Sequence, residues 1–124
     1  MLREYLRDSG ATMNCAVFAG DWIRLATGRD PVGPWRDCSE DVAGNRWGGL
    51  VALTARAMRR HGFMVTSEPR YGDIGVITYR DQAGRRIVCA IKISGGWIFR
   101  ISTTLSRVPD FAVRTVMAWR IRGE

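Results

Sequence analysis

The sequence predicts an α+β fold in which N-terminal helices pack on an antiparallel sheet of about four strands. Apolar residues recur at helical spacing in the first half of the chain, and after Gly62 they alternate as in strands. Short turns separate the alternating segments, as expected for hairpins. The 124 residues are enough for one domain with a real core and too few for two, so we expect a single domain over 1–124.

The helical half divides into three segments. The first ten residues predict a short helix that stops at Gly10. A second helix begins at Cys15 and ends at Thr27 and Gly28, and a third runs from Gly49 to His61 and stops at Gly62. The second helix has the most regular apolar stripe, made of Cys15, Phe18, Ala19, Trp22, Ile23 and Ala26.

The strand-like half contains four predicted strands. Their sequences are GDIGVITY, RIVCAIKI, WIFRIS and TVMAWRI, with turns at DQAG and SGG and a loop around Pro109 before the last strand. In the second strand, Cys89 alternates with Ile87, Ile91 and Ile93, which predicts that this face belongs to the core. Val88, Ala90 and Lys92 occupy the opposite face, where we expect Lys92 to be solvated.

Composition limits the classes of function. Hydrophobic residues make up 46% of the chain and charged residues 25%, a balance typical of folded globular proteins. No apolar run reaches the ~18 residues of a membrane span, and the first residues are too polar for a signal peptide, so we expect synthesis in the cytoplasm. The net charge of +7 suits nucleic acid, an anionic cell-wall polymer or an acidic protein partner. The arginines are scattered without interleaved aromatic residues, which disfavours nucleic acid.

The cysteines do not form a recognisable framework. Cys15, Cys38 and Cys89 are odd in number and widely spaced, which argues against disulfide pairs and against a close pair of zinc ligands. His61 is the only histidine of the chain. The sequence therefore predicts no metal site and no cofactor.

Several short sequence motifs together resemble those of a known family. A cysteine at the start of a helix, a GD dipeptide opening a strand and the segment VCAIKISGG resemble the NlpC-type cell-wall peptidases, a compact branch of the papain-like fold. The segments NCAVFAGDWIRLATGRDP, GDIGVI and AWRI are similar to an uncharacterised relative of that branch that is common in tail gene modules of bacteriophages. The resemblance covers about Asn14 to Ile121.

The resemblance implies a catalytic cysteine with a histidine base on the second strand. When the family's catalytic positions are transferred to this sequence, the nucleophile falls on Cys15, where the positive end of a helix favours the thiolate. The histidine position falls on Val88, or on Ile87 or Arg86 if the alignment shifts, and none of these is a base at neutral pH. His61 is a weaker candidate base, because the end of a helix gives it a structural role of its own.

These observations leave three hypotheses for the function. The leading one is a small structural or docking component of a phage tail tip, with a degenerate NlpC-type fold, located in the virion and bound to other tail proteins. The second is an active cysteine peptidase or amidase that acts on peptidoglycan with Cys15 as its nucleophile. The third is a basic nucleic-acid-binding module.

A candidate partner surface lies in the polar segment WRDCSEDVAGNRW. Two tryptophans beside arginines are typical of interface cores. The alternative is that the aromatic rings hold a long loop against the domain. The residues concerned are Trp35, Arg36, Arg46 and Trp47.

Overall fold

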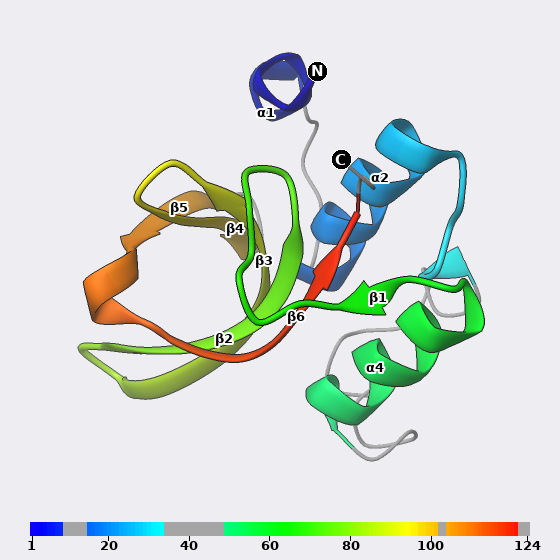
Figure 1. Ribbon diagram of the computed structural model, residues 1–124. Coiled ribbons are helices and arrows are strands. Elements are labelled where there is room, and N and C mark those ends of the chain that lie inside the picture. The colour runs from blue at the N-terminus through cyan, green and yellow to red at the C-terminus, as the bar shows by residue number, and fades with distance from the viewer. Residues whose placement is uncertain (9–14, 34–48, 102–103, 122–124) are drawn as a thin grey trace.

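The computed structural model describes residues 1–8, 15–33, 49–101 and 104–121. These residues form helices followed by an antiparallel sheet of six strands (Figure 1). The predicted α+β class is confirmed, whereas the predicted number of about four strands is too low. No helix in the described ranges is long and apolar enough to cross a membrane.

The helices form close to where their apolar spacing predicts. They are α1 (Leu2–Asp8), α2 (Cys15–Thr27) and α4 (Leu50–Arg60). The predicted stripe of α2 is buried from Cys15 to Ile23, and the indole nitrogen of Trp22 donates to the carbonyl of Gly72 at 2.7 Å. This bond ties the middle of α2 to the start of the sheet.

The sheet has the order β1-β6-β2-β3-β4-β5, and all its pairs are antiparallel. The sequence analysis missed β1 and β5. β1 has only two residues, and β5 is an exposed edge strand that ends at Pro109, which sequence alone assigns to a loop. The strands are β1 (Met64–Val65), β2 (Ile74–Asp81), β3 (Gly84–Ile93), β4 (Gly96–Ile101), β5 (Thr104–Pro109) and β6 (Arg114–Arg120), with the short 3-10 helix η2 (Asp110–Ala112) before β6.

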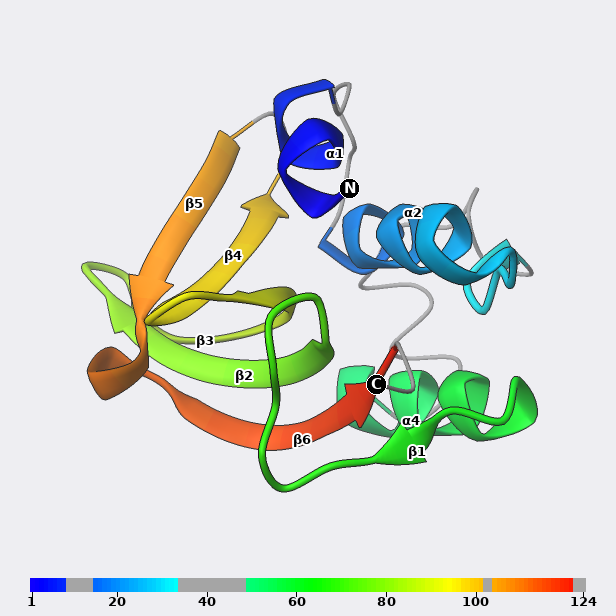
Figure 2. The same cartoon turned by 45° about the horizontal axis from the view of Figure 1, so that its top comes forward.

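The sheet curls so that its two faces bury different sets of side chains (Figure 2). Helices α2 and α4 pack against one face, which carries Val76, Cys89 and Ile91. The inside of the curl holds Trp97, and Gly75 is needed there because a Cβ at this position would lie 2.7 Å from the Trp97 ring. The core therefore continues on both sides of the central strands.

The helices do not cover the whole of the first face. Cys89 and Ile91 are buried as predicted, but Ile87 on the same face of β3 is 45% exposed. Ile87 pairs with Thr78 nearer the β2–β3 turn. The alternation of apolar residues identified the face correctly, but not where the helices stop covering it.

Candidate functional site

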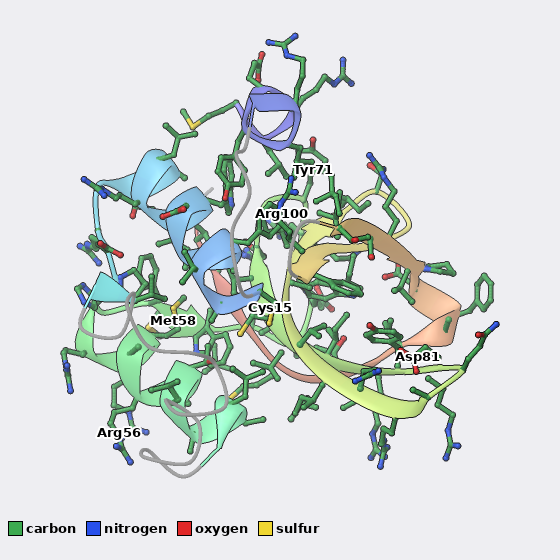
Figure 3. All side chains as sticks on the ribbon, turned by 180° about the vertical axis from the view of Figure 1, so that it is seen from behind. Cys15, Arg56, Met58, Tyr71, Asp81 and Arg100 are labelled. Carbon is green, nitrogen blue, oxygen red and sulfur yellow. The ribbon has the colours of Figure 1, made fainter. Side chains whose placement is uncertain are left out.

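The Cys15 thiol is the first candidate site, and it is enclosed by the protein. Cys15 is the first residue of α2 and is 1% exposed (Figure 3). Its Sγ accepts the backbone N–H of Cys89 at 3.2 Å, a contact between residues that lie 74 positions apart. The start of the helix thus meets the second long strand of the sheet.

This hydrogen bond lies where two strands separate. The register between β3 and β4 runs from Ile93↔Gly96 to Ile91↔Ile98, and Cys89 lies two residues beyond the last pair. The N–H of Cys89 points away from β2 and meets Cys15. The thiol therefore takes the place of the carbonyl that a continued β4 would supply.

A second thiol lies on the helix-covered face of the same strand. The Sγ of Cys89 is 3.5 Å from the Oγ1 of Thr54 on α4, and both residues are buried. This contact confirms that Cys89 belongs to the core. The sequence analysis missed Thr54, although its position three residues before Ala57 places it on the same side of α4.

The structure places the predicted histidine position next to the thiol but leaves it without a base. Val88 precedes Cys89 on β3, is buried, and pairs with Ile77 across the strands. An isopropyl side chain neither accepts nor donates a proton. The nucleophile position and the base position of the resemblance are thus neighbours, and the base position carries an aliphatic residue.

His61 lies at the opposite end of α2 from Cys15. Its carbonyl accepts a hydrogen bond from the Nη1 of Arg29, which follows α2 by two residues. A helix of 13 residues is ~20 Å long, and Cys15 occupies its other end. The backbone N–H of His61 donates to Ala57 as part of the end of α4. The structure does not bring His61 to the thiol.

Tyr79 is a titratable group close enough to Cys15 for the two to interact electrostatically. Burial is the main reason that the pKa of Tyr79 is raised, the charges of Asp81 and Cys15 raise it further, and Arg86 opposes them. The ring of Tyr79 packs on Phe99 with centroids 5.1 Å apart. A phenol with a raised pKa keeps its proton at neutral pH and does not act as a base there.

Lys92 does not act on the thiol either. We expected it to be solvated, but it is largely covered: its Nζ donates to the carbonyls of Ile93 and Gly96 and pairs with Asp110 at 3.2 Å. These bonds join the β3–β4 turn to η2. A single lysine in a run of apolar residues carries no sequence signal for this role.

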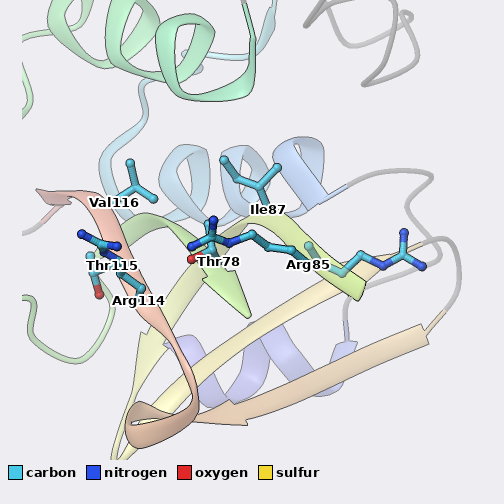
Figure 4. A pocket seen from close by; sticks show the side chains of 7 residues that line it. Thr78, Arg85, Ile87, Arg114, Thr115 and Val116 are labelled. Carbon is cyan, nitrogen blue, oxygen red and sulfur yellow. The ribbon is translucent and has the colours of Figure 1, made fainter. Parts of the chain in front are cut away.

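The second candidate site is a surface hollow of about 580 Å³ over β2, β3 and β6 (Figure 4). The sequence analysis did not identify it. A signal was present, because two arginines placed symmetrically about the DQAG turn lie opposite each other once the hairpin forms. We call it the arginine hollow, and its lining includes Thr78, Arg85, Arg86, Ile87, Arg114 and Val116.

The remaining sequence candidates lie outside the residues that the structure describes. These are Cys38 and the predicted partner surface of Trp35, Arg36, Arg46 and Trp47. Within the described ranges, no three potential metal-ligating side chains lie together.

Comparisons with protein-family models, with curated proteins and with solved structures find no match to this chain. The two candidate sites are therefore interpreted from their own residues.

Proposed function

We propose that this chain is a non-catalytic docking domain, a structural component of a bacteriophage tail tip built on a degenerate NlpC-type fold. One observation carries the non-catalytic part of the proposal. The Cys15 thiol is 1% exposed and is engaged as a hydrogen-bond acceptor inside the sheet.

Thiol catalysis needs conditions that the described residues around Cys15 do not provide. A catalytic cysteine must be ionised and must reach a substrate carbonyl, with a base within hydrogen-bond distance. Here the thiol is 1% exposed, and the family base position is Val88. Cys15 is not among the described lining residues of the arginine hollow, of the hollow beside α1 or of the small cavity between α2 and α4.

The arrangement of Cys15 and β3 supports the NlpC-type part of the proposal. In the resemblance, the helix-borne cysteine faces the beginning of the second strand. In this chain, the thiol contacts Cys89, the neighbour of the residue at the histidine position. If a peptidase ancestor lost catalysis, we would expect its descendant to keep this contact and to carry another residue, here a valine, in place of the base.

Exposed apolar side chains support a docking role. Phe111 in η2 is 93% exposed, and Ile87 and Val116 are each nearly half exposed beside arginines. Aromatic and arginine side chains dominate the energetics of protein interfaces. The proposal therefore assigns the outer surface, rather than the thiol, to the function.

The location is tested on purified virions of a phage that encodes the chain. We expect mass spectrometry to find the chain in the tail fraction and a tagged copy to co-purify with tail proteins. A chain that is absent from the virion and binds no tail protein would contradict the proposal.

The enzymatic alternative is tested on purified peptidoglycan. We expect no release of muropeptides above the level of the Cys15→Ser variant, because the wild-type thiol is enclosed. Release by the wild-type chain that the substitution abolishes would establish a cysteine hydrolase and overturn the non-catalytic reading.

A further inference from the structure

We infer that the arginine hollow binds an acidic peptide segment of a partner protein, with an apolar side chain of that segment seated on Ile87 and Val116. The inference deepens the proposed docking role and rests on it. It names the surface that docks and the chemistry of the partner. The hollow lies on the same face of the sheet as Cys89, beyond the part that the helices cover (Figure 4).

The strand register gathers three arginines on this face. Arg80 lies directly opposite Arg85 in the β2–β3 hairpin, and Arg114 of β6 lies opposite Thr78 of β2. Thr78 and Arg80 are two residues apart on one strand, so their side chains share a face. Like charges opposite each other destabilise a strand pair, and a bound anion relieves this repulsion.

Carboxylates of the described residues do not neutralise this cluster. Asp81 pairs with Arg86 at 2.9 Å. Among the residues that the structure describes, no carboxylate forms an ion pair with Arg80, Arg85 or Arg114. Three exposed guanidinium groups therefore remain available, and each presents the planar fork of donors that binds a carboxylate in two places.

An apolar floor accompanies the charges. Ile87 and Val116 are 45% and 46% exposed and line the same hollow. Val116 is an extra residue of β6, because Met117 pairs with Val76 and Thr115 with Ile77. Such a bulge bends the strand and re-aims its side chains. The irregularity thus places Val116 across from Ile87.

The combination of charge and apolar surface selects a peptide over a nucleic acid. Single-stranded nucleic acids are held by cations together with aromatic rings on which the bases stack. Among the residues that the structure describes, the lining of this hollow contains no aromatic side chain, and its floor is aliphatic. A segment that alternates acidic and branched apolar residues satisfies both the guanidinium groups and the floor.

The inference is tested by titrating the full chain with a synthetic peptide of alternating glutamate and leucine. We expect binding that shifts the methyl NMR signals of Ile87 and Val116 and that weakens with added salt. The same peptide with lysine for glutamate serves as the control probe and should not bind.

Variants locate the binding on the molecule. We expect Arg85→Glu with Arg114→Glu to weaken binding of the glutamate–leucine peptide by about tenfold or more, because two charge-assisted contacts become repulsive. Ile87→Ser should also weaken peptide binding, because it removes part of the apolar surface on which the leucine side chains of the peptide would pack. The matched control is Arg56→Glu, a charge reversal on the exposed side of α4, which should leave affinity within about twofold (Figure 3). Circular dichroism confirms that each variant is folded.

Three outcomes would overturn the inference: absence of peptide binding, equal weakening by Arg56→Glu, or tighter binding of a single-stranded DNA probe at the same methyl groups. The virion experiment distinguishes this failure from failure of the proposed function. If the chain is found in tails but does not bind the peptide, only the inference that the arginine hollow binds an acidic peptide is contradicted. A peptide-binding chain that is absent from virions contradicts the tail role alone.

Discussion

At the scale of single residues, Cys15 and Gly75 show how closely this fold is packed. The thiol supplies a hydrogen-bond acceptor that the backbone lacks where β3 and β4 separate. Gly75 supplies space, because the Trp97 ring lies where a side chain at this position would begin. Both residues belong to sequence words of the NlpC resemblance, and in this structure both have packing roles.

Gly75→Ala should destabilise the protein by about 1–3 kcal/mol, because the added methyl group meets the buried Trp97 ring. The free energy of unfolding in denaturant measures the effect. Gly33→Ala is the matched control, since among the described residues its Cβ meets only the Asp30 carboxylate at 3.4 Å. Equal stability of the two variants would show that the sheet yields around Trp97.

The raised pKa of Tyr79 makes the free energy of unfolding depend on pH in the alkaline range. Burial, followed by the charge of Asp81, raises its pKa in the folded state, so the folded protein holds this proton more tightly than the unfolded chain. This contribution is complete below the unfolded pKa of about 10 and is lost as the pH rises through the folded value. Asp81→Asn should lower the Tyr79 pKa, measured by NMR titration of the tyrosine rings with Tyr79→Phe for assignment. An unchanged or higher pKa in Asp81→Asn would contradict this cause.

At the scale of elements, Asp73 joins the beginning of the sheet to its last strand. Its buried carboxylate accepts the backbone N–H groups of Arg70 and Ile121 at 2.8 and 3.1 Å and the Nε of Arg120 at 2.8 Å. Arg120 also donates to Thr66 and Glu68. The GD dipeptide of the sequence is therefore the anchor that holds β6 and the β1–β2 connection together.

Asp73→Ala should lower the free energy of unfolding by about 3–5 kcal/mol, because it leaves Arg120 and two backbone donors without their acceptor. Denaturant unfolding and faster amide exchange at Ile121 measure the loss. Asp81→Ala removes an exposed carboxylate that is paired with Arg86 and should change stability very little. Similar effects of the two substitutions would contradict the anchoring role.

The elements that sequence predicts well are those whose apolar residues are mostly buried in the core. Helix α2 and strands β2, β3, β4 and β6 form where apolar periodicity places them. β5 escapes prediction because its residues are mostly exposed, and β1 because it is two residues long. Ile87 is misjudged because the extent of helix cover is a tertiary property.

At the scale of the whole molecule, the curled sheet keeps the thiol and the arginine hollow in different places. The thiol is enclosed where α2 meets β3, and the hollow opens near the β2–β3 turn and β6. The sequence pointed to the Cys15 site through one short motif at the start of a helix. It did not point to the arginine hollow, because only strand pairing brings Arg85 and Arg114 together. The reactive residue is thus enclosed, and the surface suited to binding lies elsewhere on the sheet.

The rate at which a thiol reagent modifies Cys15 at neutral pH, mapped by mass spectrometry, distinguishes an enclosed thiol from a catalytic one. Because Cys15 is enclosed and bonded to Cys89, we expect modification only through unfolding, at a rate far below that of a free thiol and rising with denaturant. Modification of the native chain faster than a free thiol would show an accessible, ionised nucleophile and contradict the account.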